Sequence, residues 1–377
     1  MPPFLTARPT RRILLIGSLA AAANSLLAAC GARDATPVGT AAAAVTAIPG
    51  TTAQTAPTTA PATIAAVGQS TIKAKLGIVT GINSADVYLA QVKGFYATHG
   101  IDAELITFQS ATVQRDALIS GDIDLSAQAP FHVYLAQAKG TPLKIVGNRR
   151  NIVDIALVVR RDLADKVKQT TDLKGHSLAV SAIGAWDWAV ANTYLKANGL
   201  DAQNDIRFVG KGTTTALTLF KTKQVDAAAI NPPDLTDVIA GDAGTYLINP
   251  ADEATHLRYF KAARAMSRAW LTHQRVIDGK PDAIAGVIAA ADDAFRYFHQ
   301  ASVDEVAAAL LPKFDGTSLE TLKRSIGDDL KAAIPAGVIM SRAAYAADQQ
   351  VFIDGGLTTR EIPFDIAVEG RWAHVTD

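Results

Sequence analysis

The chain has 377 residues, 36 basic against 36 acidic side chains, 49% hydrophobic residues and a single cysteine. Balanced charge argues against nucleic acid as a partner, because phosphate binding requires a basic excess. One cysteine excludes an intramolecular disulfide framework and a cysteine-cluster metal site, and we expect no metal and no cofactor. The length suits two domains or one large α/β domain.

Residues 1–30 have the composition of an export signal. Three arginines precede an apolar run over 13–23, which is too short to span a membrane. The run ends in Leu27-Ala28-Ala29-Cys30, which resembles the lipobox of bacterial lipoproteins, and the resemblance implies a lipid on Cys30. We predict a lipoprotein signal peptide over 1–30. The alternative is an ordinary secretory signal that is cut elsewhere, with Cys30 incidental.

Residues 31–70 are predicted to form a disordered tether. They contain 13 Ala, 9 Thr and 4 Pro but only one acid and one base, so they cannot bury enough apolar surface to offset chain entropy. As a coil they would span roughly 35 Å. An alanine-rich helix over 41–47 is the alternative. With a lipid at Cys30, the tether would hold an extracytoplasmic body at the cell membrane.

The folded body begins at Thr71, where short apolar runs start to alternate with amphipathic stretches. This alternating pattern predicts strands joined by helices. Strands are expected over 74–79, 103–108, 123–127 and 143–147, and helices over 84–98, 111–120 and 131–138. Strands separated by helices of this length favour a parallel sheet that is covered on both faces.

The same pattern returns about a hundred residues later, with strands over 176–181 and 206–209 and helices over 186–197 and 214–222. Gly100-Ile101-Asp102 has a counterpart in Gly199-Leu200-Asp201. Ile123-Asp124 matches Val225-Asp226 at an offset of 102. We infer an α/β fold of two like-built lobes joined by crossing strands. A ligand cleft is expected between them, at the carboxyl ends of the strands.

After Asp252 the alternation stops. A strand over 262–271 is expected to return to the first lobe, followed by helices over 281–299, 303–311, 318–329 and 342–352. The predicted domains are lobe 1 over 71–156 and 258–377 and lobe 2 over 157–257. We expect the lobes to move about two crossing segments near 155–160 and 256–265.

Five segments together resemble one family, although each is weak alone. They are Ala117–Asp124, Gly140–Val146, Asp172–Val180, Tyr194–Leu200 and Lys223–Ala228. In this order they resemble the solute-binding proteins of ABC importers for nitrate, aliphatic sulfonates, taurine and thiamine-precursor pyrimidines, over about residues 72–357. The resemblance implies a type II periplasmic-binding-protein fold, a monomer that closes on a small organic solute, and an ABC permease as partner. One departure is Lys223, where the family usually has glycine, so this turn need not be left-handed.

Loops after the predicted strands carry the candidate ligand contacts. The full set is Asn83, Ser84, Asp86, Ser110, Gln128, Phe131, Trp186, Asp187, Thr213 and Asn231. Helix N-termini offer N–H groups to anionic oxygens, although each serine is as well explained by capping its own helix. Gln128 and Asn231 lie in matching loops of the two lobes, so their amides could hold a polar ligand from either side.

Charge and aromatic residues bear on the ligand. Asp86 and Asp187, if they lie inside the cleft, would repel a sulfonate, which favours a neutral or cationic ligand such as a pyrimidine. Of Arg149 and Arg150, at least one is expected on a solvated rim. Trp186 and Trp188 are two residues apart and cannot share a helix face. We expect Trp186 to cover the ligand; core packing of both tryptophans is the alternative.

The rival function is an enzyme on the same fold, such as a pyrimidine synthase of the thiamine pathway. Seven scattered histidines form no His-Glu-x-x-His pattern, and no Gly-x-Ser-x-Gly elbow or Walker loop is present. The cysteine cluster that the synthase resemblance implies for iron is also missing. His132 remains a possible catalytic base, but we predict a binding protein and not an enzyme.

Overall fold

The computed structural model describes residues 71–232 and 234–377. The predicted signal peptide (1–30), the lipidation site at Cys30 and the tether (31–70) lie outside the described residues. Within the described ranges, no helix is both long enough and apolar enough to cross a lipid bilayer.

The first sheet has five strands in the order β2-β1-β3-β10-β4. Their bounds are β1 (Ile72–Val79), β2 (Ile101–Phe108), β3 (Leu125–Gln128), β4 (Leu143–Arg150) and β10 (Arg268–His273). β1 is parallel to β2 and β3, as predicted. The sheet is not wholly parallel, however, because β10 lies antiparallel between β3 and β4. This is the expected returning strand, which begins at Arg268 and enters from the second sheet in the opposite direction.

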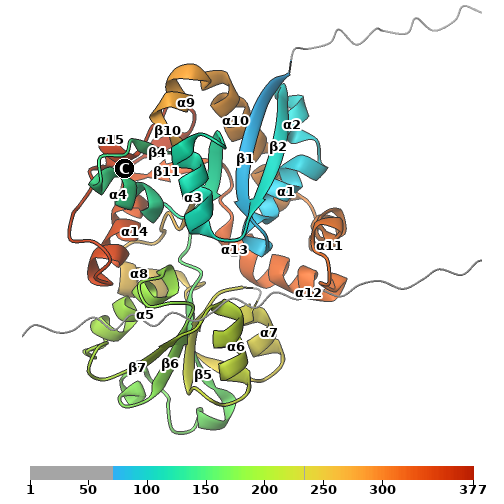
Figure 1. Cartoon of the computed structure of the whole chain (residues 1–377). Helices are drawn as coiled ribbons and strands as arrows, with labels where there is room; N and C mark the ends of the chain where they lie inside the picture. Colours follow the sequence, from blue (N-terminus) through green and yellow to red (C-terminus); the bar gives the residue numbers. More distant parts are fainter. Residues whose placement is uncertain (1–70, 233) are drawn as a thin grey trace, which may run out of the picture. The chain divides into compact units, whose positions relative to one another are not determined.

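Helices cover both faces of this sheet. One face holds α1 (Ala85–Val92), α2 (Phe95–Thr98), α9 (Gln274–Gly279), α10 (Pro281–Gln300) and α11 (Val303–Leu310); the other holds α3 (Ala111–Ser120), α4 (Phe131–Ala138), α14 (Arg342–Asp354) and α15 (Phe364–Ala367). Figure 1 shows α1, α2 and α10 beside β1 and β2. Along β10, Trp270 enters one core while Ala269 and Leu271 enter the other, as the two-residue period of a strand requires. The helix predicted over 84–98 breaks because Gly94 adopts a left-handed φ of 74°.

The second sheet repeats the arrangement, in the order β7-β6-β8-β5-β9. Its strands are β5 (Ala156–Arg160), β6 (Ser177–Val180), β7 (Arg207–Gly210), β8 (Ala227–Ile230) and β9 (Gly244–Ile248). Its helices are α5 (Trp186–Ala197), α6 (Thr213–Lys221), α7 (Asp234–Ala240) and α8 (Glu253–Phe260). Here β5 is the strand that arrives from the other lobe, and it runs antiparallel to β8 and β9.

The predicted internal repeat is visible in the structure as the same strand pairing and the same aspartate hydrogen bond in both lobes. Leu76 of β1 pairs with Leu125 of β3, and Leu178 of β6 pairs with Ala227 of β8, so both pairs are offset by the same 102 residues. In the first lobe, the Asp124 carboxylate accepts the Lys75 amide at 3.0 Å. In the second, the Asp226 carboxylate accepts the Ser177 amide at 2.9 Å. Each aspartate ties the start of the central strand to the strand beside it.

Two short segments carry the chain between the sheets, residues 151–155 after β4 and residues 261–267 before β10. They are hydrogen-bonded to each other: Ala265 N–H donates to the Asn151 carbonyl at 2.7 Å, and the Ser267 hydroxyl donates to the Ile152 carbonyl at 2.5 Å. The crossings share only residue 155 with the segment predicted at 155–160, but they share 261–265, half of the segment predicted at 256–265; the other residues belong to β5 and α8. The lobe boundaries near 156 and 257 stay a prediction.

The remaining elements complete the first lobe, except the 3₁₀ segments η2 (Arg161–Leu163) and η3 (Thr170–Leu173), which pack with the second sheet. They are α12 (Leu319–Arg324), the π-helix η5 (Ser325–Leu330), α13 (Lys331–Ala333), β11 (Ile339–Ser341), β12 (His374–Thr376) and the 3₁₀ segments η1 (Ile82–Ser84), η2 (Arg161–Leu163), η3 (Thr170–Leu173) and η4 (Leu311–Lys313). The helix predicted over 318–329 is therefore split between α12 and η5. β11 and β12 form a separate two-stranded parallel sheet.

Helix α14 belongs to both hydrophobic cores. Its Tyr345 and Phe352 pack in the core of the first sheet, whereas Ala347 and Val351 pack with the second sheet and α5. The Asn192 amide of α5 donates to the Gly355 carbonyl at 3.4 Å, just beyond the end of α14. The lobes are therefore in contact along α14 as well as through the crossing segments.

Lys223 adopts the left-handed conformation, with φ at 63°. Its counterpart in the first lobe is Gly121, at φ 98°. The prediction that this turn need not be left-handed is wrong. The repeated hydrogen bonding after the helix imposes it: Gln224 N–H donates to the Leu219 carbonyl at 2.8 Å, just as Asp122 N–H donates to that of Ala117 at 2.9 Å.

Replacing Lys223 by glycine is expected to stabilise the fold by about 0.5–1 kcal/mol, because glycine adopts φ > 0 without a Cβ clash. The measurement is the free energy of unfolding from urea titrations. The matched control is Lys221→Gly, at the end of α6, which should destabilise by about 0.5–1 kcal/mol. Equal losses in both variants would contradict the assignment of strain to Lys223.

Asp348 is a fully buried carboxyl group between α14 and α4. The Tyr134 hydroxyl donates to Asp348 Oδ2 at 2.8 Å, and Oδ1 has no partner among the described residues. Burial raises the pKa of Asp348 to about 8. The carboxyl group is therefore protonated in the folded protein at neutral pH, whereas the unfolded chain releases that proton near pH 4.

This proton makes stability fall as pH rises from about 4 to about 8, by up to about 1.4 kcal/mol per pH unit, because only the folded state keeps it. Asp348→Asn keeps an acceptor for Tyr134 and removes the titration. The variant should therefore gain stability over the unmodified protein as the pH is raised from 5 to 8, in urea titrations. Asp354→Asn, at the partly exposed end of the same helix, serves as control; parallel profiles for all three proteins would contradict the assignment.

Candidate functional site

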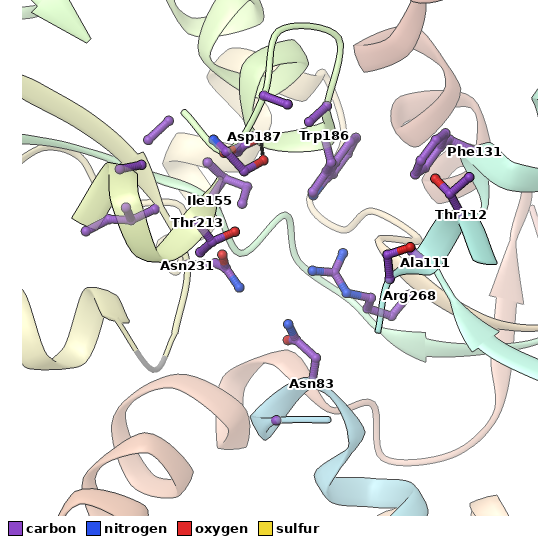
Figure 2. A pocket seen from close by; sticks show the side chains of 18 of the residues that line it. Asn83, Ala111, Thr112, Phe131, Ile155, Trp186, Asp187, Thr213, Asn231 and Arg268 are labelled. Atoms are coloured by element: carbon purple, nitrogen blue, oxygen red, sulfur yellow. Dashed lines mark hydrogen bonds between the residues drawn. The ribbon is translucent and has the colours of Figure 1, made fainter. Parts of the chain in front are cut away.

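A cavity of about 790 Å³ opens at the carboxyl ends of strands from both sheets. Its walls come from the loops after β1 and β2 in the first lobe and after β6 and β8 in the second. A smaller chamber of about 230 Å³ adjoins it on the side of the first lobe and shares Asn83, Phe131 and Arg268 with it. This is where open α/β sheets place their ligands. Figure 2 shows Asn83, Asn231 and Arg268 converging on the same space.

The structure places nine of the ten predicted contact residues on these two cavities. The larger one is lined by Asn83, Ser110, Phe131, Trp186, Asp187, Thr213 and Asn231, and the smaller one also by Ser84 and Gln128. Asp86 lines neither. Ser110 caps α3, since its hydroxyl oxygen accepts from the Val113 amide at 3.3 Å. Ser84 caps nothing; its hydroxyl donates to the Val79 carbonyl at 2.7 Å.

Asp86 is engaged in a buried ion-pair cluster behind Asn83. Arg149 donates to both Asp86 carboxylate oxygens, at 2.9 and 2.7 Å, and Arg150 lies 3.1 Å from one of them. All three side chains are 1% exposed. Despite burial, the adjacent guanidinium groups hold the pKa of Asp86 below its usual value. The expectation of a solvated rim for at least one of these arginines is wrong, because each finds a buried partner.

Asp187 lines the cavity, but its carboxylate is already occupied. It accepts from the Ser181 amide at 2.5 Å, the Ser181 hydroxyl at 2.8 Å and the Trp188 amide at 3.0 Å. Burial raises the pKa of Asp187, and these hydrogen bonds oppose the increase. With Asp86 outside the cleft and Asp187 bound to its own loop, the two charges that favoured a neutral or cationic ligand no longer support that inference.

Two arginines that the loop-based prediction missed line the cavity. Arg268, the first residue of β10, lines both cavities, and Arg115 of α3 lines the larger one. Arg268 Nη2 lies 3.3 and 3.4 Å from the two oxygens of Asp154, which precedes β5. The signal for Arg268 was available, because a strand that returns from the other lobe must start at the cleft. The prediction considered only loops that follow strands.

Aromatic rings form a ladder across the two lobes. Trp186 of α5 stacks on Phe352 of α14, with centroids 4.7 Å apart, and Phe352 stacks on Phe131 of α4 at 5.0 Å. Trp188 packs instead against Phe208 of β7. Phe131 and Trp186 border both cavities. Phe352 was not predicted, because a phenylalanine at a buried helix position looks like any other core residue.

Gln128 and His132 close the smaller chamber. The polar groups around Gln128 fix the orientation of its side-chain amide. In that orientation the amide nitrogen donates to His132 Nε2 at 3.0 Å and to the Ala111 carbonyl at 3.2 Å. The imidazole proton is then on Nδ1, which has no partner in the described part of the chain. Burial lowers the pKa of His132 to about 3, so the ring is neutral and a poor proton acceptor at neutral pH.

Known proteins similar to this chain include binding proteins and an enzyme. A protein of Brucella abortus (strain 2308), whose provisional name is that of a binding protein, is 24% identical over 238 residues, covering 62% of this chain and 69% of that protein. The periplasmic aliphatic sulphonate binding protein SsuA of Escherichia coli superposes with a TM-score of 0.66 at 19% identity, covering 81% and 94% of the two chains. The desulfurization enzyme DSZB superposes with a TM-score of 0.55 at 15% identity, covering 80% and 97%. These superpositions establish the periplasmic-binding-protein fold.

The family comparison covers most of the first lobe and all of the second sheet. Residues 81–302, which are 222 of the 377 residues, match the family model described as NMT1/THI5 like. The match includes both crossing segments and every predicted ligand contact from Asn83 to Asn231. The chain therefore belongs to the NMT1/THI5-like family.

Proposed function

We propose that this protein is the solute-binding component of an ABC importer and captures a small organic solute by closure of its two lobes. The observation that carries the proposal is the cavity at the carboxyl ends of both sheets, into which Asn83 of the first lobe and Asn231 of the second both project (Figure 2). A ligand that bridges these amides gains contacts to both lobes only when the cleft is closed, so binding favours the closed state.

The crossing segments supply the movable connection. Each is only five to seven residues long, over 151–155 and 261–267, and the two are hydrogen-bonded to one another. A short paired connection allows rotation of one lobe against the other with few backbone changes. No chemical step is required of the site, and the permease would receive the solute from the closed form.

The enzyme alternative is less well supported by the residues that border the cavity. The chain's one cysteine is Cys30, outside the described residues, so no thiol comes from the cavity walls over 80–268. The candidate base His132 has a pKa of about 3 and is held by Gln128. Among residues 71–232 and 234–377, no three His, Cys, Asp or Glu side chains group as a metal site would require. Binding without chemistry accounts for these features.

The proposed location is the outer face of a cell membrane. The lipobox at Leu27–Cys30 supports a lipid on Cys30, and the composition of residues 31–70 supports a flexible tether. Tethering keeps a monomeric binding protein at high local concentration beside its permease.

Cys30→Ser is expected to release the protein from the membrane fraction, because the thiolate that would receive the lipid is absent. The measurement is metabolic labelling with an alkyne fatty acid, together with fractionation of cells that express the full chain. Ser25→Ala, within the same signal, is the control and should leave labelling unchanged. Equal labelling of the Cys30→Ser protein would exclude this lipidation site.

A panel of nitrate, taurine, alkanesulfonates, arene anions and pyrimidines should contain a solute that raises the melting temperature and is recovered unconverted. For that solute, Asn83→Ala and Asn231→Ala should each lower the affinity by about 3–10-fold, since each removes one hydrogen bond. Calorimetry gives the affinity. Asn204→Ala, in an exposed loop of the second lobe, is the matched control. Turnover of the solute would replace this proposal with the enzyme alternative.

A further inference from the structure

The first-lobe wall of the cavity holds more positive than negative charge. Arg149 and Arg150 share one carboxylate, that of Asp86, and Arg268 faces Asp154. Three guanidinium groups against two carboxylates leave one positive charge without a partner in this cluster. Arg150 Nε also lacks a hydrogen-bond partner among the described residues. A buried charge of this kind is costly unless a counter-charge reaches it.

The surplus lies next to the cavity. Arg149 borders the smaller chamber, and Arg268 borders both cavities. Figure 2 shows the Arg268 side chain directed into the cavity between Asn83 and Asn231. The contacts of Arg268 to Asp154, at 3.3 and 3.4 Å, are longer than the 2.7–2.9 Å of a strong guanidinium–carboxylate pair. A ligand carboxylate or sulfonate could therefore compete for this guanidinium.

The smaller chamber has more buried donors than buried acceptors without a partner in the described part of the chain. His132 Nδ1 and Trp186 Nε1 are buried N–H groups with no partner in residues 71–232 and 234–377. Gln114 Oε1 is the chamber's corresponding acceptor without a partner. Because buried donors are normally satisfied, a ligand that fits here brings acceptor oxygens.

The opposite end of the cavity carries carboxyl groups in place of guanidinium groups. Asp187 and Asp234 of the second lobe line the larger cavity. Burial raises the pKa of both carboxyl groups. An anionic group is thus attracted to the first-lobe end, because none of the described second-lobe residues that line the cavity is basic.

The aromatic ladder described above also borders the cavity. The rings of Trp186, Phe352 and Phe131 are nearly parallel, with interplanar angles of 22° and 21°. The outer two rings border the cavity. Aromatic side chains prefer to pack against flat rings in offset-stacked or edge-to-face arrangements, which adds to the burial of apolar area.

Building on the proposed function, we propose that the captured solute is a planar aromatic anion, an arene carboxylate or sulfonate. Its charged group binds Arg268 at the mouth of the smaller chamber, and its ring packs against Phe131 and Trp186, the two rings of the ladder that border the cavity. Arg268 is then the residue that selects for charge, and Phe131 and Trp186 are the residues that select for a flat ring.

The test is calorimetry of the full chain with matched probes. Benzoate, benzenesulfonate and 2-naphthoate carry both features, benzamide lacks the charge, cyclohexanecarboxylate lacks the flat ring, and benzylammonium reverses the charge. At least one arene anion should bind about 30-fold more tightly than benzamide, because only the anion forms a buried charge-assisted pair with Arg268. It should bind about 3–10-fold more tightly than cyclohexanecarboxylate.

Variants separate the two selecting features. Arg268→Gln should weaken the best arene anion by about 30-fold or more and change benzamide by less than about 3-fold. Asp154→Asn should strengthen the arene anion, because it frees Arg268 from its competitor. Phe131→Leu should reduce the preference for the arene over cyclohexanecarboxylate. Arg296→Gln, a surface arginine of the same lobe, and Phe314→Leu, which packs against Tyr88 in the first-lobe core, are the matched controls.

Equal or tighter binding of benzamide, benzylammonium or taurine would overturn the inference while leaving the importer role intact. So would the absence of any bound arene anion when another solute of the wider panel binds. Weaker arene binding by Asp154→Asn would overturn the role of Arg268 specifically. If no solute of either panel bound or was converted, the proposed function itself would fail together with the inference.

Discussion

The architecture depends on a chain that crosses twice between two like-built sheets at one place. Residues 151–155 and 261–267 are joined to each other by short backbone and hydroxyl hydrogen bonds, so both crossings form one connection. Each crossing delivers an antiparallel strand, β5 or β10, into the fourth position of the opposite five-stranded sheet. The loops after β1, β2, β6 and β8 face a common space beside this connection.

The same connection brings charge to the cavity. Arg268 starts the strand that returns from the second lobe, and Asp154 leads into the strand that leaves for it. The ion pair between them thus joins the two crossings at the wall of the cleft. A ligand that bound Arg268 would act on the connection proposed as the hinge, so charge recognition and lobe closure would be coupled through one side chain.

Periodicity and repeats were enough to predict most of the fold. The bounds of α3, α4 and α5 agree with the prediction, because apolar spacing and flanking turns define them locally. The 102-residue offset correctly identified the duplicated lobes. Gly94 and Lys223 show the limit: a glycine inside a helical pattern broke a helix, while a lysine took the left-handed position because tertiary hydrogen bonds outweigh local propensity.

The site was predicted less completely than the fold, for a physical reason. Loops after strands identify which residues reach the cleft, and nine of ten candidates do. Whether a charge there is free depends on partners that are distant in sequence. Asp86 meets Arg149 from 63 residues away, and Arg268 meets Asp154 from 114 residues away. No pattern within one loop encodes such pairings. The ligand charge inferred from the loops therefore rested on two carboxylates that are in fact already paired or hydrogen-bonded within the protein.

Helix α14 is a second contact between the lobes, and it lies outside the walls of both cavities. Since Ala347 and Val351 are buried with one lobe and Tyr345 and Phe352 with the other, a motion that parted the lobes along this helix would expose both sets to water. Rotation about an axis near α14 keeps that apolar area covered throughout the cycle. Closure on a solute would then leave the α14 contacts intact, and none of the binding free energy would go into re-forming them.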